Sequence, residues 1–196
     1  MTWVTAVVSE YTALLDANVL YPAPMRDILM QLAVTDLFHA KWSADIHREW
    51  ITALLDREPQ RDRAALERTR DLMDAHVRDC LVTGYEGLID SFVLPDPKDR
   101  HVLAAAVVGR CDVIVTQNLK DFPSSVLAPL GIETQHPDEF LSNQLDLAPG
   151  VFCSCVRKVR ARLKNPPYTP EDYLRNLTEQ GLVATAAELG QFSALI

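Results

Sequence analysis

The sequence predicts an α/β protein in which a central parallel sheet lies between two layers of helices, followed by a helical extension. The segments TALLD at 12–16 and DVIVT at 112–116 are apolar runs without polar alternation, which is typical of strands buried on both faces. Helical patterns separate the strand-like segments, as in parallel α/β folds. From about Pro137 onward the strand pattern disappears and only helical patterns remain.

Turn residues and apolar spacing set the order of elements between these strands. Two prolines begin a helix expected at 22–38, and HAKW at 39–42 is a short strand. Ser43 is a good N-cap for a helix that reaches about Arg57. The other elements predicted here are an amphipathic helix at 60–78, a helical turn at 85–91, a helix at 123–130 and an edge strand at 132–135.

The segment DPKD at 96–99 is a helix start. Asp96 suits the N-cap, Pro97 suits the first helical position, and Asp99 falls at the third. The helix continues through VLAAAVV and is expected to end at Gly109, because glycine favours the position just after a helix.

The C-terminal part is predicted to be entirely helical. Thr169 followed by Asp172 forms a variant of the capping box, and Gly181 separates the last two helices. We therefore expect an α/β domain over residues 1–140 and a helical C-terminal extension over 141–196. The four helices are expected at 137–146, 150–164, 170–180 and 182–195.

Composition narrows the class of protein. The chain has 196 residues, 48% of them hydrophobic and 23% charged, which suffices for a full core. Its net charge of −8 argues against broad nucleic-acid binding through a basic face, but an acidic enzyme can still act on nucleic acid. No apolar run is long enough for a membrane span, and the N-terminus lacks the basic start of a signal peptide, so we expect a cytoplasmic protein without membrane contact.

The cysteines and histidines indicate neither zinc nor a disulfide framework. The four cysteines include one C-x-C pair, Cys153 and Cys155, with no second pair of ligands nearby. The five histidines do not form a set at metal spacing, and there is no G-x-S-x-G elbow or glycine-rich phosphate loop.

Acidic residues gather where the predicted strands end. Asp16 ends the first strand, and Asn118 and Asp121 follow DVIVT. Ligands of open parallel sheets bind outside the carboxyl ends of the strands, so these residues point at one crevice. Asp99 in the first turn of its helix is expected to reach it. Glu49, about two turns into the helix that follows Ser43, is expected to project into it from the side.

Convergent carboxylates repel one another unless a cation neutralises them, and Mg²⁺ prefers such oxygen ligands. Taken singly, each acid also has a simpler explanation. Asp16 and Asp121 suit turns, Asp96 and Asp99 suit helix caps, and Glu49 suits a solvated helix surface. From the residues alone, the sequence predicts acids at a sheet crevice and no more.

Four segments together resemble the PIN-domain family. They are LLDANVLYP at 14–22, IHREW at 46–50, DPKDRHVLAAA at 96–106 and VIVTQNLKDF at 113–122. They occur in the family's order, and the resemblance covers roughly residues 12–140. It implies a PIN-like three-layer α/β/α fold with a central parallel sheet.

The resemblance also implies roles for individual residues. Asp16, Glu49, Asp99 and Asp121 match the family's four acids, which bind metal and carry catalysis. Thr116 and Asn118 belong to the same turn motif as Asp121, and Asn118 can take the fourth position in its place. Asp96 can share the role of Asp99. The residues expected to support the acids are Asn118, Thr116, Asp96 and Asn18.

Within the family, the chain is similar to VapC-type toxins with a helical C-terminal extension. The segment that carries this similarity is KNPPYTPEDYL at 164–174. The resemblance implies a ribonuclease that depends on Mg²⁺ or Mn²⁺, forms a homodimer and is inhibited by a cognate antitoxin protein.

Basic residues suggest how RNA is held. The segment 156–165 contains five basic residues and no acid, which fits either a solvated helix face or a phosphate-contacting strip. Arg48 is expected to pair with an acid or to contact a partner. The candidates for RNA binding are Arg100, Lys120, Arg157, Lys158 and Arg160.

Other functions remain open at this point. One is a non-catalytic acidic α/β module that binds a metal or a partner, and another is a PIN nuclease that processes RNA without being a toxin. A haloacid-type phosphohydrolase is disfavoured, because its signature needs an aspartate two residues after Asp16 and position 18 is asparagine.

Overall fold

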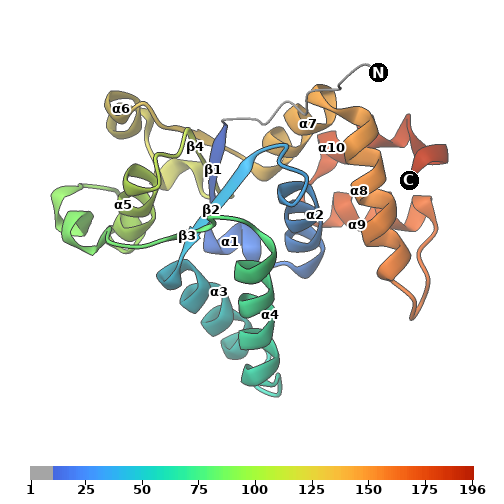
Figure 1. The fold of residues 1–196 in the computed structure, drawn as a ribbon, viewed down its shortest axis with the longest axis horizontal. Coiled ribbons are helices and arrows are strands. Elements are labelled where there is room, and N and C mark those ends of the chain that lie inside the picture. The colour runs from blue at the N-terminus through green and yellow to red at the C-terminus, as the bar shows by residue number, and fades with distance from the viewer. Residues whose placement is uncertain (1–10) are drawn as a thin grey trace, which may run out of the picture.

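The computed structural model describes residues 11–196 (Figure 1). Its centre is a five-stranded sheet in the order β3-β2-β1-β4-β5, and each neighbouring pair is parallel. This confirms the predicted fold class. The strands are β1 (Thr12–Leu15), β2 (His39–Ser43), β3 (Leu81–Val82), β4 (Val113–Val115) and β5 (Glu133–Gln135).

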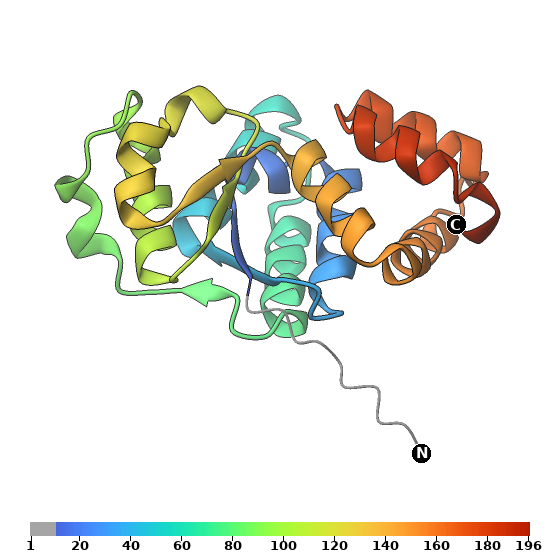
Figure 2. The same ribbon diagram turned by 90° about the horizontal axis from the view of Figure 1, so that it is seen from above.

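Helices cover both faces of the sheet. Helices α5 and α6 lie on one side and α2 on the other, with the C-terminal helices beyond α2 (Figures 1 and 2). The α-helices up to this extension are α1 (Ala17–Leu20), α2 (Ala23–Ala33), α3 (Ala44–Arg57), α4 (Arg63–His76), α5 (Arg100–Val108) and α6 (Ser124–Leu127). Short 3₁₀ turns are η1 (Glu86–Ser91), η2 (Pro97–Asp99), η3 (Leu119–Asp121) and η4 (Ala128–Leu130).

The sheet is apolar on both faces because helices cover both. Every residue of β4 is fully buried, as are Leu14 and Leu15 of β1, so these strands carry no polar alternation. The register pairs Leu14 with Ile114 and Leu15 with Val115, which places the ends of β1 and β4 side by side. The sheet core therefore determines where the residues after these two strands lie.

The structure differs from the expected elements in several details. The helix expected at 22–38 ends at Ala33, because Asp36 adopts a left-handed backbone with φ of 58° that no helix can continue. The helix start at 96–99 is a separate 3₁₀ turn, and α5 begins only at Arg100. The sequence pattern missed β3, since two residues at a sheet edge are too short to show a period.

Gly109 follows α5 for a different reason than expected. Its φ is −72°, and the left-handed conformation falls on Arg110 instead, with φ of 51°. A Cβ at position 109 would lie 2.9 Å from the Ala105 carbonyl oxygen and 3.0 Å from a methyl group of Val82. Glycine is needed here because the backbone passes too close to its neighbours for a side chain.

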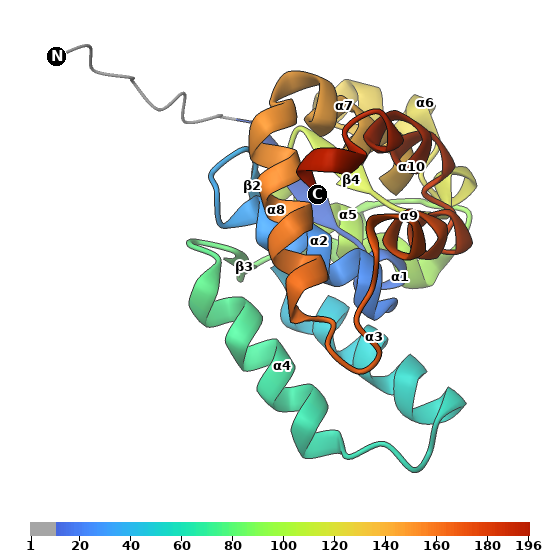
Figure 3. The ribbon, with the colours of Figure 1, turned by 90° about the vertical axis from the view of Figure 1, so that its right-hand side faces the viewer.

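The C-terminal extension is helical, as predicted. Helix α8 lies along α2, and α9 packs against α10 (Figure 3). Thr169 and Asp172 form the expected capping box, and Gly181 has a φ of 83°. The helix expected at 182–195 is shorter in the structure, since α10 ends at Gly190. The elements are α7 (Pro137–Leu147), α8 (Pro149–Arg162), α9 (Pro170–Glu179), α10 (Val183–Gly190) and η5 (Ser193–Leu195).

The expected division into two domains after residue 140 stays a prediction. That position falls within α7, so one continuous helix links the two expected parts. The expectation that the chain carries no signal peptide concerns residues 1–10, which lie outside the described residues. Over residues 11–196, no helix is long and apolar enough to cross a membrane.

Candidate active site

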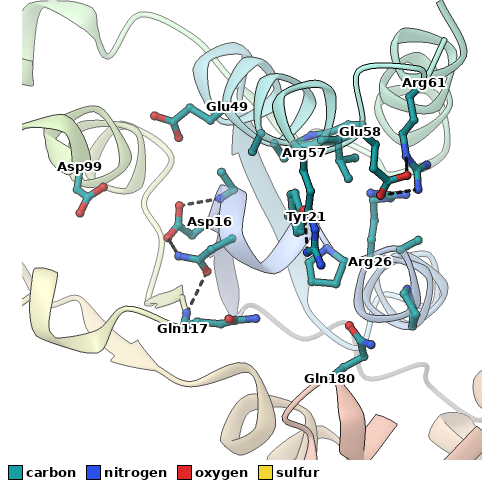
Figure 4. A pocket seen from close by; sticks show the side chains of 18 of the residues that line it. Asp16, Tyr21, Arg26, Glu49, Arg57, Glu58, Arg61, Asp99, Gln117 and Gln180 are labelled. Atoms are coloured by element: carbon teal, nitrogen blue, oxygen red, sulfur yellow. Dashed lines mark hydrogen bonds and ion pairs between the residues drawn. The ribbon is translucent and has the colours of Figure 1, made fainter. Parts of the chain in front are cut away.

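A groove of about 870 Å³ opens at the carboxyl ends of β1 and β4 (Figure 4). Its walls come from α1, α2, α3, the loop before α4, the turn before α5, and the end of α9. Asp16, Glu49 and Asp99 lie toward one end of it, and the three lining arginines lie toward the other. The charged residues that line it are Asp16, Arg26, Glu49, Arg57, Glu58, Arg61, Asp96, Lys98, Asp99 and Glu179.

Asp16 is buried at the floor of the groove and is 5% exposed. It follows β1 directly and caps α1, because its Oδ1 accepts a hydrogen bond of 2.6 Å from the Ala17 amide. Its Oδ2 accepts hydrogen bonds from the Thr116 hydroxyl at 2.7 Å and from the Asn18 amide nitrogen at 2.6 Å. Burial raises the pKa of Asp16, whereas the bonds from Thr116 and Ala17 oppose that shift.

Asn18 and Thr116 tie the ends of β1 and β4 together. The Asn18 side chain donates to the Thr116 hydroxyl at 2.9 Å and accepts from the Gln117 amide at 3.0 Å. The Thr116 hydroxyl also accepts a 3.1 Å hydrogen bond from the Asn118 amide. With Thr116 fully buried, this network leaves the Asp16 carboxylate only one orientation.

Asp99 lies across the groove from Asp16 and is half-buried. Burial raises the pKa of Asp99 to about 6, and the charges of four further acids add to the effect. Those acids are Asp16, Asp96, Asp121 and Glu49. The predicted acids therefore crowd around Asp99 closely enough to oppose its ionisation.

Glu49 projects from α3 toward the same space and contacts His101 of α5. The distance from Glu49 Oε1 to His101 Nε2 is 2.8 Å. Burial alone would lower the pKa of His101, but the hydrogen bond and charge of Glu49, with Asp45 and Asp16, raise it overall. Sequence reasoning missed His101. The signal was its position two residues after Asp99, because residues within one helical turn stay close to each other.

The remaining predicted members differ in their environments. Asp121 lies in η3 outside the groove lining, but its charge reaches Asp99. Asn118 is exposed, and only its backbone amide joins the network around Thr116. Asp96 is exposed, and its carboxylate caps η2 by accepting from the Lys98 amide at 2.8 Å.

The donors that face the groove are carboxylate oxygens, which suit a hard divalent cation. Within residues 11–196, no three His, Cys, Asp or Glu side chains lie close enough to form a ready-made metal cage. Mg²⁺ usually takes only one or two carboxylates and completes its shell with water and substrate phosphate. The crowding around Asp99 is the repulsion that a cation relieves, so the donor set fits Mg²⁺ or Mn²⁺.

The opposite end of the groove is basic, and sequence reasoning missed it (Figure 4). Arg26 comes from α2, Arg57 from the last turn of α3, and Arg61 from the loop before α4. A signal was present, because Trp50, Ala53, Leu54, Arg57 and Glu58 follow helical spacing on one face of α3 and all line the groove.

None of the five predicted RNA-binding residues lines the groove. Arg160 has a structural role, because its guanidinium donates to the carbonyls of Tyr168 at 2.6 Å and Ile196 at 3.1 Å. Arg157 and Lys158 are exposed on α8, and Lys120 is exposed beside Asp121. Arg100 is half-buried, and its Nε has no hydrogen-bond partner among the described residues. Outside these candidates, Arg48 forms the expected ion pair, with Asp45.

Carboxylates gathered at the carboxyl ends of a parallel sheet define a class of α/β domain with an acidic site in a sheet crevice. Comparison with known proteins identifies the family. Residues 12–120 match the family profile described as "PIN domain", and residues 137–191 match the "VapC50 C-terminal domain". The first match spans more than half of the chain, so the chain belongs to the PIN-domain family. Both resemblances expected from the sequence are thereby confirmed.

One relative in Mycobacterium tuberculosis (strain H37Rv) has the name "Putative ribonuclease VapC50". It is 48% identical to the chain over 83 residues, which are 42% of this chain and 49% of that protein. The match therefore covers about half the length of that relative. No solved structure matches the chain.

Proposed function

We propose that this PIN-domain protein is a metal-dependent endoribonuclease that hydrolyses phosphodiester bonds of RNA. The observation that carries the proposal is the meeting of Asp16, Glu49 and Asp99 in one groove of a PIN domain. The similarity to a protein named as a ribonuclease supports RNA as the substrate.

Each acid has a part in the proposal. Asp16 and Asp99 hold the cation, because they face each other and Asp16 is locked in place. Glu49 joins them from α3, and its contact with His101 sets its direction. Asp121 lies outside the groove lining and adds its negative charge to the site, where it acts on Asp99.

Bound Mg²⁺ or Mn²⁺ supplies Lewis-acid stabilisation of charge on the phosphate and lowers the pKa of a coordinated water. The chain itself contributes fixed carboxylates and a buried floor that orients them. Of the two open choices, we favour Asp99 over Asp96, because Asp96 caps η2. For the fourth position we favour Asp121 over Asn118, because Asn118 offers the site only a backbone contact.

We further propose that the protein is the toxin of a type II toxin–antitoxin pair and acts in the cytoplasm. The match of the C-terminal helices to the VapC50 C-terminal domain supports this role. A cognate antitoxin protein would then inhibit the nuclease, and a homodimer is the assembly we expect. A PIN nuclease that processes RNA without being a toxin would share the same site chemistry.

The test is cleavage of single-stranded RNA by the purified chain. We expect Mg²⁺ or Mn²⁺ to support cleavage, EDTA to stop it, and Asp16→Asn to abolish it while the circular dichroism spectrum stays native. The products should carry 5′-phosphates, because water rather than the 2′-hydroxyl attacks.

Three results would contradict the proposal. Products ending in 2′,3′-cyclic phosphate would show that the 2′-hydroxyl, rather than water, attacks. Full activity of Asp16→Asn would remove this residue from the site. A protein that binds Mg²⁺ and cleaves no RNA would support the non-catalytic module instead.

A further inference from the structure

The groove continues past the acids to a basic end that catalysis at the acids does not explain. This end is formed by Tyr21, Arg26, Arg57, Glu58 and Arg61 (Figure 4). Three arginines meet here in a chain whose net charge is −8. The interactions of each arginine show which of them is available to a ligand.

Arg61 is already neutralised. Its Nε donates to one oxygen of Glu58 at 2.8 Å, and its Nη2 lies 3.3 Å from the other oxygen. This two-point pairing is the geometry in which a guanidinium satisfies a carboxylate best. Arg61 and Glu58 therefore form an ion pair in the groove lining that carries little net charge.

Arg26 provides a fixed charge beneath the groove. It is 8% exposed, donates to the Leu20 carbonyl at 2.7 Å, and lies 4.9 Å from the ring centroid of Trp50. Among residues 11–196, no carboxylate forms an ion pair with it. Its guanidinium therefore stays in place beside the groove, and the charge of the neighbouring Asp27 offsets part of its own.

Arg57 is the available cation. It is exposed, and its Nη1 donates to the hydroxyl of Tyr21 at 3.2 Å, a neutral partner. No ion pair to a carboxylate forms within the part of the chain that the structure describes. The charge of Glu58 acts on Arg57 from nearby, but Glu58 forms its ion pair with Arg61. An arginine held in direction by a phenol and not tied to a carboxylate is suited to bind an anion from the groove.

We propose that Arg57, oriented by Tyr21 and reinforced by the charge of Arg26, binds a backbone phosphate of single-stranded RNA beyond the scissile bond. The inference rests on the proposed nuclease function. RNA is favoured over an acidic protein partner because one groove joins Arg57 to Asp16 and Asp99. A strand seated at the acids that continues along this groove reaches Arg57. Basic side chains that follow the backbone are how proteins hold single strands.

The binding test uses a fluorescent single-stranded RNA oligonucleotide in EDTA, so that no cleavage occurs. Arg57→Ala should weaken binding about tenfold and reduce the slope of log affinity against log salt by about 0.7, the value for one phosphate on a single strand. The matched control is Arg78→Ala, because Arg78 is 70% exposed, pairs with Asp36 and follows the far end of α4. It should change neither quantity.

Kinetics with Mg²⁺ separate this subsite from the catalytic centre. Arg57→Ala should lower kcat/KM about tenfold on the oligonucleotide and leave cleavage of a dinucleotide at the wild-type rate. Arg57→Lys should recover part of the loss, since it keeps the charge and loses the planar fork.

The outcomes are distinguishable. If wild-type protein cleaves RNA while Arg57→Ala keeps its affinity, salt slope and kinetics, the subsite is wrong and the nuclease stands. If wild-type protein binds but cleaves nothing, the nuclease fails and the binding data alone decide the subsite. Unchanged RNA affinity together with lost binding of polyglutamate would assign Arg57 to a protein partner and overturn the proposal.

Discussion

The two ends of the groove are built in opposite ways. At the acidic end, Asp16 is 5% exposed and accepts hydrogen bonds from three donors. At the basic end, Arg57 is exposed, and within residues 11–196 its guanidinium makes one hydrogen bond, to Tyr21. The end where we place the chemistry is held by the sheet, whereas the end where we place the substrate backbone relies on a side chain that can move.

This contrast has a physical reason. Carboxylates that share a cation must keep their positions while repelling one another, so they need a rigid support. A contact to a flexible phosphate backbone needs only a cation within reach. Substitutions at the acidic end should therefore cost more than substitutions at the basic end, and the predictions follow that order.

The largest effect is expected for Asp99→Asn. The substitution removes the charge of a carboxylate that we propose holds the cation. Cleavage should therefore fall roughly 100- to 1000-fold, which is typical for loss of a fixed electrostatic group. The matched control is Asp96→Asn, which should keep most of the activity because Asp96 caps η2. Equal losses in both variants, measured as kcat/KM, would mean that the two acids share the role.

Thr116→Val should have the next largest effect. It removes the hydroxyl that donates to Asp16 while keeping the buried volume, so metal affinity should fall roughly 10- to 100-fold. Titration of Mn²⁺ by calorimetry measures this. Asn118→Ala serves as the comparison, and a loss as large as that of Thr116→Val would show that the Asn118 side chain, rather than only its amide, supports the site.

Metal affinity should also depend on pH. The pKa of Asp99 is raised to about 6, so below that value the carboxylate must lose a proton before it can bind. Affinity should fall roughly tenfold per pH unit well below 6. In Asp99→Asn this dependence should be reduced, and an unchanged profile would assign it to another group.

The same raised pKa affects the stability of the metal-free protein. Between the unfolded and folded pKa values of Asp99, the folded state binds more protons than the unfolded state. Its ionisation therefore opposes folding above about pH 6, and this destabilisation fades as pH falls through that value. Thermal unfolding in EDTA at two pH values, with wild-type protein and Asp99→Asn, isolates the contribution.

Tyr21→Phe should have the smallest effect. The substitution removes the acceptor for Arg57 and keeps the charge of Arg57. RNA affinity should therefore fall only about threefold, in line with loss of one exposed hydrogen bond to a neutral acceptor. A loss as large as that of Arg57→Ala would show that orientation, rather than charge, governs binding at the basic end.

Part of this site could be predicted from the sequence. Asp16 and Asp121 follow apolar strands, and parallel strands bring their carboxyl ends to one edge, so local pattern predicted their neighbourhood. The role of Arg160 could not be predicted. It belongs to a basic segment that suits RNA, but the fold brings it against the Ile196 carbonyl, 36 residues away in sequence.

The sequence by itself determined the α/β class, the order of elements, the acids at the strand ends and the capping box at Thr169, because these depend on local periodicity and on turn chemistry. The tertiary structure decided which side chains share a groove. Tyr21 and Arg57 come from different segments and meet only when α1 packs against α3. Contacts between distant segments depend on how the helices pack, and no local pattern encodes that.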